Sequence, residues 1–269
     1  MDKILQFHKV SSAHKFAGVG MGGNIFITLN SLLSSNKDDN LYVDMETNSC
    51  VCTEDNFNKF NTHNCWEYYY DQMAKPNTDN IVTNKSEKAF LNYNKVPLVD
   101  YSDLQYRFNN NFKLKDYLQN ELDSYYNNNL RDKITLGVQI RLTDMLHHHK
   151  VSPLSKYLIR IQEILNKNPN IEQLFIATDD HRAIEEVSKH ISIPIIYHEA
   201  FRASDDDPQT DENDRMRNNR EFHKYNLSKE CIKEIYTLSM CNFLLRADIS
   251  AISNVATLLS TKIDTLYNL

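Results

Sequence analysis

Short apolar runs alternate with segments of mixed polarity along the C-terminal half of this chain. The apolar runs predict strands at residues 135–141, 173–178, 193–197 and 243–246, and the run at 243–246 is expected to be the last strand. The segments after these runs predict helices at residues 153–166, 183–190, 228–238 and 250–259. Strands that alternate with helices are typical of a parallel sheet, which binds ligands at the carboxyl ends of its strands.

The N-terminal half begins with the same alternation and then loses it. Residues 3–10 predict a strand, residues 25–33 a helix, and residues 41–44 a short buried strand. A strand, a helix and a second strand in this order open a Rossmann-like half. Residues 56–94 are polar and aromatic with weak periodicity, so irregular chain with short helices is expected there.

A further helix is predicted at residues 114–130, where apolar side chains recur at helical spacing. The tract Asn127-Asn128-Asn129 ends this helix, and we place the domain boundary there. The expected fold class is therefore α/β, with an N-terminal Rossmann-like domain at residues 1–130 and a C-terminal one at residues 131–269.

The glycines stand at two places only. Four of the five lie between Gly18 and Gly23, after the first predicted strand, and the fifth, Gly137, lies in the mid-chain strand that leads to Arg141. Glycine lets a backbone approach another group closely. Two such places, half a chain apart, predict two nucleotide-binding halves that face one cleft. The first group alone is weak evidence, because it fits the G-x-G-x-x-G pattern poorly.

The net charge of −6 argues against a nucleic-acid partner, because phosphate backbones require a basic face. Six of the 36 acidic residues lie together in residues 202–220, which we expect to form a loop before a helix capped by Ser228. No apolar run approaches the roughly 20 residues that span a bilayer, and the N-terminus does not resemble a signal peptide. These features predict a cytosolic protein without a membrane span.

Five cysteines are an odd number and do not indicate a disulfide scaffold. The pairs Cys50/Cys52 and His63/Cys65 have tolerable spacing for a zinc knot. The alternative is two loosely spaced pairs in an aromatic, asparagine-rich segment. The spacing favours this alternative, so we expect no metal.

Polar and charged residues follow three predicted strands of the C-terminal half at the same edge of the sheet. In chain order they are Arg141 and Asp144, Asp179 and Asp180, and Ser250 and Ser253. An arginine together with a helix N-terminus is a good receptor for a pyrophosphate. A neighbouring carboxylate can accept hydrogen bonds from a base or a ribose, so the edge is a candidate nucleotide-diphosphate site.

Each of these residues also has a purely structural interpretation. Arg141 and Asp144 could form an ion pair at the end of a strand. Asp180 and Ser250 could cap the helices that follow them, because both residue types are favoured at the N-cap. The order and spacing of all the groups together, rather than any one of them, favour the ligand site.

The segment from Gln139 to Asp144 reads Q-I-R-L-T-D and resembles the H-x-R-x-x-D strand of the GDP-fucose fucosyltransferases. The similarity is greatest to the α-1,6-fucosyltransferases, including the bacterial nodulation type. Residues 175–180 resemble their x-A-T-D-D strand end, and residues 235–256 resemble their final motif. More loosely, residues 20–24 and 66–70 are similar to their N-terminal segments.

This resemblance implies a GT-B architecture in which the C-terminal domain holds most of the donor, GDP-fucose. It implies that Arg141 binds the β-phosphate and stabilises the leaving diphosphate, that Asp180 binds the guanine edge, and that Ser250 contacts phosphate. The donor-binding positions it indicates are Gly20, Gly22, Gly23, Gln139, Arg141, Asp180, Ser250 and Ser253. Such enzymes invert the anomeric carbon, use no metal or cofactor, and transfer fucose to a glycan hydroxyl.

Three departures from the pattern leave alternatives open. The motif histidine is Gln139, the second arginine is Leu142, and a later arginine is Asn254. A different nucleotide sugar is one alternative. The other is a non-catalytic protein that binds a sugar nucleotide or a glycan.

The catalytic base is expected among histidines. His149, in the tract 147–149, falls about where the α-1,6 enzymes have a glutamate, and a histidine can deprotonate a hydroxyl near neutral pH. His8 and His14, beside the first glycines, are rival candidates. The structural alternative for His149 is an exposed polar loop.

Overall fold

The computed structural model of the chain describes residues 7–11, 20–35, 40–45, 52–54, 57–73, 81–83, 96–143, 152–204, 218–247 and 250–269. Several residues singled out above lie outside these ranges, namely Gly18, His14, Asp144, the tract 147–149 with His149, and most of the acidic stretch. His8 lies in a described strand, but its side chain is not described.

The C-terminal half is a parallel sheet of five described strands in the order β10-β9-β6-β7-β8. Their bounds are Thr135–Ile140 (β6), Gln173–Thr178 (β7), Ile195–Ile196 (β8), Phe243–Arg246 (β9) and Thr265–Asn268 (β10). The expectation that 243–246 is the last strand was wrong, because β10 pairs with β9 beyond it. Only one of the four residues of β10 is buried, so the strand carries little of the apolar signal used for the others.

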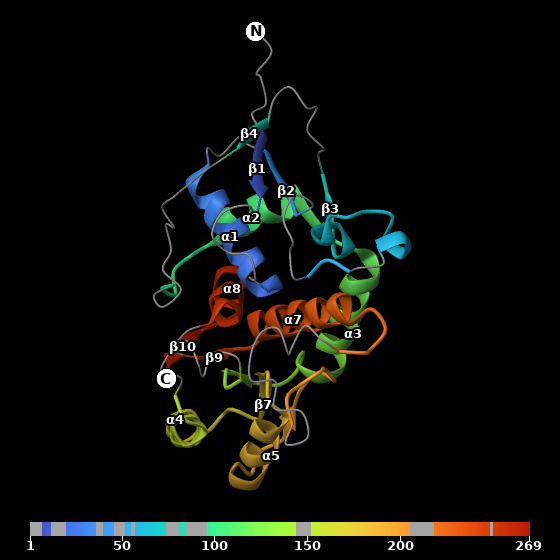
Figure 1. The fold of residues 1–269 in the computed structure, drawn as a ribbon. Coiled ribbons are helices and arrows are strands. Elements are labelled where there is room, and N and C mark those ends of the chain that lie inside the picture. The colour runs from blue at the N-terminus through green and yellow to red at the C-terminus, as the bar shows by residue number, and fades with distance from the viewer. Residues whose placement is uncertain are drawn as a thin grey trace.

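Helices cover both faces of this sheet (Figure 1). Their bounds are Leu154–Lys167 (α4), His181–His190 (α5), His223–Ser239 (α7) and Ala251–Leu259 (α8). Leu136, Val138 and Ile140 of β6 pack with α4 and α5 on one face. On the other face, Gly137 lets α7 come close, since a Cβ there would lie 3.0 Å from Leu238 and 3.1 Å from Cys241.

The N-terminal half has a smaller parallel sheet in the order β2-β1-β4. Its elements are Phe7–Ser11 (β1), Met21–Ser34 (α1), Asn40–Asp44 (β2) and Ile81–Thr83 (β4). The predicted β–α–β opening is confirmed in β1, α1 and β2. The remaining elements are Phe57–Phe60 (η1), Cys65–Tyr68 (η2), Tyr70–Gln72 (β3), Ser102–Asn111 (α2), Phe112–Leu114 (β5) and Asp116–Asn129 (α3).

Several boundaries differ from the predictions. Helix α1 begins at Met21, so Gly22 and Gly23 lie in its first turn and Gly20 is its N-cap. Ser228 does not cap α7, which begins five residues earlier, after Phe222 in a left-handed conformation with φ of 50°. Residues 56–94 contain two strands, β3 and β4, that pattern alone did not reveal.

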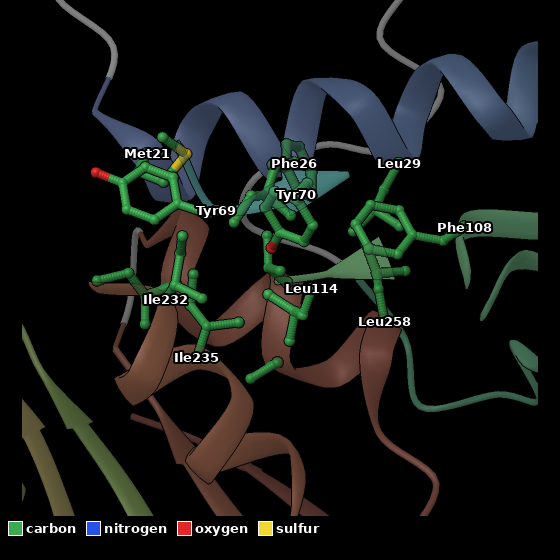
Figure 2. Packing of buried hydrophobic residues seen from close by; sticks show 14 of the residues in the cluster. Met21, Phe26, Leu29, Tyr69, Tyr70, Phe108, Leu114, Ile232, Ile235 and Leu258 are labelled. Atoms are coloured by element: carbon green, nitrogen blue, oxygen red, sulfur yellow. The ribbon is translucent and has the colours of Figure 1, made fainter. Parts of the chain in front are cut away.

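One hydrophobic core joins the two halves. Helices α7 and α8 lie between the C-terminal sheet and α1 (Figure 1). Figure 2 shows Met21 and Leu29 of α1 facing Ile232 of α7 and Leu258 of α8, with Tyr70 among them. All five side chains are at most 2% exposed. The predicted boundary after residue 130 therefore separates two sheets but not two cores.

Gly22, at the start of α1, lets this helix approach α8 and α7 closely. A Cβ at this position would lie 3.2 Å from Cγ1 of Ile252 in α8 and 3.5 Å from Sγ of Cys231 in α7. A side chain would have to push these helices away. The glycine is explained by packing, because it lies inside a helix where glycine is otherwise unfavourable.

We expect Gly22→Val to lower the free energy of unfolding by about 2 kcal/mol or more, because it overpacks the contact with Ile252. Gly20→Val is the matched control. A Cβ at Gly20 meets nothing within 4 Å, and its φ of −66° suits any residue. Urea titration of both variants measures the difference. Equal losses in the two variants would contradict the packing role of Gly22.

Candidate functional site

The C-terminal sheet reverses its winding between β6 and β9. Chain order runs outward from β6 through β7 to β8 on one side, and through β9 to β10 on the other. Open parallel sheets bind ligands outside the carboxyl ends of the strands at such a switch point. Arg141 follows β6 there, and Ser250 follows β9 and begins α8. The predicted site residues from these two strands therefore lie at one place.

The first turn of α1 reaches the same place from the N-terminal half. Gly22 packs on Ile252, which is in the first turn of α8. The N-termini of two helices, one from each half, thus meet beside the switch point. Each helix N-terminus carries backbone N–H groups without intrahelical partners and a partial positive charge, so the pair favours an anion.

Asp179 organises the loop after β6. Its carboxylate accepts hydrogen bonds from the backbone amides of Leu142 (3.0 Å) and Thr143 (3.2 Å) and from the Thr143 hydroxyl (2.8 Å). One carboxylate oxygen lies 3.4 Å from Nε of Arg141, whose side chain is 20% exposed. A buried carboxylate is stable only with such donors and a counter-charge. Asp179 therefore positions Arg141, a role that the sequence analysis did not assign to it.

Asp180 is the N-cap of α5, which confirms the capping role considered above as an alternative to ligand binding. Its carboxylate accepts from the backbone amide of Arg182 at 2.9 Å and from the guanidinium of the same residue, through Nε at 2.8 Å and Nη2 at 2.6 Å. The sequence analysis missed Arg182, although its place two residues after a capping aspartate was a usable signal. A contact between Asp180 and a nucleotide base stays a prediction.

Ser250 also has the capping arrangement, because its hydroxyl accepts from the backbone amide of Ile252 at 3.2 Å. Ser253 and Gln139 differ. Each residue is 1% exposed, and neither Oγ of Ser253 nor Oε1 of Gln139 has a hydrogen-bond partner among the described residues. Orphaned buried polar atoms are costly and uncommon. Gln139 belongs to β6 and Ser253 to α8, the elements that flank the switch point.

Arg246, the last residue of β9, is a buried structural arginine that the sequence analysis overlooked. Its guanidinium donates to the backbone oxygen of Val96 (2.6 Å), to Oδ1 of Asn254 (3.1 Å) and to Oδ1 of Asn268 (2.6 Å). Burial lowers its pKa from the ordinary value. Asn254, which stands where the resemblance leads one to expect an arginine, is thereby tied to a guanidinium from the neighbouring strand.

A segment after β8 covers the end of β7. The backbone of Ala203 bonds that of Asp179 and His181 at 2.9 Å each. Arg202 donates to the backbone oxygen of Thr178 at 3.1 Å and forms a buried ion pair with Glu234 of α7 at 3.0 Å. These contacts fix the backbone around Asp179 and Asp180.

His198 begins this segment in a buried position. Its Nε2 lies 2.8 Å from the hydroxyl of Thr237, and its ring lies 3.9 Å from that of Tyr125. Burial, with the nearby charges of Lys233 and Arg202, lowers the pKa of His198 to about 3. The ring is therefore neutral at physiological pH and serves packing rather than proton transfer.

The zinc alternative finds no support in the described residues. No three His, Cys, Asp or Glu side chains within them lie close enough together to hold a metal ion. Cys52 and Cys65 are buried, and Cys50 lies outside the described ranges. In the same residues, no helix has the length and apolar composition needed to cross a bilayer.

The sequence matches no protein-family model and no curated protein. Solved structures do match. The NodZ α-1,6-fucosyltransferase soaked with GDP-fucose has a TM-score of 0.59 and 12% identity over 95% of this chain and 93% of that chain. NodZ from Bradyrhizobium gives the same score and coverage, and NodZ co-crystallised with GDP gives a TM-score of 0.57. The chain therefore has the GT-B fold of these fucosyltransferases, which confirms the predicted fold class.

We expect Asp179→Ala to lower the free energy of unfolding by about 2–4 kcal/mol, because it removes a buried acceptor of three hydrogen bonds and breaks the ion pair with Arg141. Asp123→Ala on α3, where the carboxylate is exposed, is the control and should change stability by less than about 0.5 kcal/mol. Similar melting temperatures for the two variants would refute the organising role.

His198 predicts a pH dependence of stability. Its folded pKa lies below the unfolded value, so its contribution is complete above about pH 6.5 and is lost as the pH falls toward 3. Between pH 7 and pH 5 we expect the wild type to lose about 2 kcal/mol relative to His198→Gln, which cannot take up a proton. Urea titrations at the two pH values measure this, and parallel losses in both proteins would contradict the neutral buried histidine.

Proposed function

We propose that the protein is a glycosyltransferase that moves a deoxyhexose, L-fucose from GDP-fucose, to a hydroxyl group of a glycan. The observation that carries the proposal is the meeting of the α1 and α8 N-termini at the switch point next to Arg141. Such an arrangement favours an anion, and the chain has the fold of NodZ, a structure of which was obtained from a crystal soaked with GDP-fucose.

The chemistry follows from where negative charge develops. When the bond between the anomeric carbon and the diphosphate breaks, charge accumulates on the leaving β-phosphate. Arg141, held by Asp179, and the helix N-termini would stabilise that charge, as electrostatically preorganised groups do. Ser253 and Gln139 would supply the hydrogen bonds that their buried polar atoms lack in the described structure.

We further propose that transfer inverts the anomeric carbon and needs no metal ion. The acceptor hydroxyl would attack from the face opposite the diphosphate while a base removes its proton. His149 is our candidate for that base, with His8 and His14 as rivals. Cationic and N–H groups at the phosphates would take the place of a divalent cation.

A second candidate is a protein that binds a sugar nucleotide without turning it over. Leu142 favours it, because this position leaves Arg141 as the single arginine in the described loop after β6. Arg246 does not fill the gap, since it is engaged by Val96, Asn254 and Asn268. A different nucleotide sugar remains a variant of the first candidate.

The deciding experiment measures GDP release from GDP-fucose, with and without a panel of glycan acceptors, in excess EDTA and then with added Mg²⁺ or Mn²⁺. Acceptor-stimulated release in EDTA, unchanged by the cations, is the expected result. Stabilisation by GDP-fucose without release would favour the binding protein. A strict cation requirement would refute metal independence, and activity with UDP- or dTDP-sugars alone would refute the assignment of GDP-fucose.

We expect Arg141→Ala to reduce turnover by about 30- to 1,000-fold, because it removes roughly 2–4 kcal/mol of charge stabilisation from the transition state. Arg141→Lys is the matched control, because it keeps the positive charge but not the planar guanidinium. Its turnover should lie between that of the wild type and that of Arg141→Ala. Circular dichroism checks that both variants are folded. Turnover of Arg141→Ala within threefold of the wild type would refute the assignment of this residue.

A further inference from the structure

Arg182, in the first turn of α5, donates hydrogen bonds to both carboxylate oxygens of Asp180. Oδ1 accepts from the backbone amide and from Nε of Arg182, and Oδ2 accepts from Nη2 at 2.6 Å and from Nε at 3.1 Å. The guanidinium thus engages both oxygens, which is the strong two-pronged geometry of an arginine and a carboxylate. Asp180 also caps α5, so its position is fixed by the backbone.

Arg182 is also the exposed member of this pair. Its side chain is 42% exposed, whereas that of Asp180 is 4% exposed. The backbone of Asp180 forms a β-bridge with that of Ala203. The amide of Asp180 donates a hydrogen bond to the hydroxyl of Thr178 at 3.2 Å. Of the two side chains, that of Arg182 is therefore the one that solvent or a ligand can reach.

A guanine base and Arg182 need the same two oxygens. Guanine offers two N–H donors on one edge, from its ring nitrogen and from its 2-amino group, and a carboxylate pairs with both at once. The guanidinium makes the same pattern of two parallel hydrogen bonds. Because each carboxylate oxygen is already engaged by Arg182, the two partners exclude each other.

We propose that Arg182 determines the base specificity of the donor site by masking Asp180, an inference that rests on the proposed nucleotide-sugar function. With Arg182 in place, the 2-amino group of guanine has no carboxylate to bind. The site then distinguishes guanine poorly from hypoxanthine, which differs only in lacking that amino group. Removing Arg182 makes the carboxylate of Asp180 available, and the site then binds guanine in preference to hypoxanthine.

The test is isothermal titration of GDP, IDP and UDP into the wild type, Arg182→Ala and Arg160→Ala. Arg160 is a matched surface arginine on α4 that pairs with Glu163. In the wild type and in Arg160→Ala we expect GDP and IDP to bind within about threefold of each other. In Arg182→Ala we expect GDP to bind at least about tenfold more tightly than IDP, because a buried acceptor now favours the extra donor.

A double variant assigns the effect to the carboxylate. Asparagine caps a helix as well as aspartate does, so Arg182→Ala with Asp180→Asn keeps α5 intact and should return the GDP/IDP ratio to about that of the wild type. A ratio in Arg182→Ala equal to that of the wild type would overturn the masking while leaving the nucleotide site standing. If none of the three diphosphates binds any of these proteins, the masking and the proposed function both fail.

Discussion

The close contact between α1 and α8 at Gly22 is the constraint on which the rest of the structure depends. Helix α8 covers one face of the C-terminal sheet, and α1 belongs to the N-terminal sheet, so their contact fixes one sheet against the other. The buried apolar surface around Met21, Leu29 and Leu258 supplies the driving force, which scales with the area removed from water. Glycine at position 22 lets the helices come close enough for that surface to be buried.

The same contact builds the candidate site. Because Ile252 is in the first turn of α8, packing Gly22 against it brings the N-terminus of α1 to that of α8. Two helix N-termini and one arginine then converge where the strand order reverses. The contact that stabilises the fold therefore also brings the groups of the candidate site together.

Buried charges on the C-terminal half are matched by specific partners. Asp179 holds Arg141 and the loop after β6, Glu234 holds Arg202, and polar oxygens of three separate segments hold Arg246. Each group would be costly to bury alone. Asp180 belongs to the same pattern, but its partner Arg182 is the one with a substantially exposed side chain. Of these pairs it is therefore the one whose cation solvent can reach most readily.

The sequence by itself determined the elements whose signal is local. Continuous apolar runs identified β6, β7 and β9 within one residue at their ends, and the alternation of strands and helices indicated the parallel sheet. The placement of Arg141 and Ser250 after neighbouring strands was also readable, because parallel strands end at one edge. The short strands β4 and β10 were not, because a strand of three or four residues is stabilised by a partner that is remote in sequence.

Only the tertiary structure decided how the individual side chains are used. The contact of Gly22 with α8 and the ion pair of Asp180 with Arg182 were not predicted from the sequence. Likewise, the helix start at Phe222 depends on a left-handed residue that pattern does not favour. Periodicity reports which face of an element is buried. The choice between competing partners for one buried group depends on distances that only the folded chain sets.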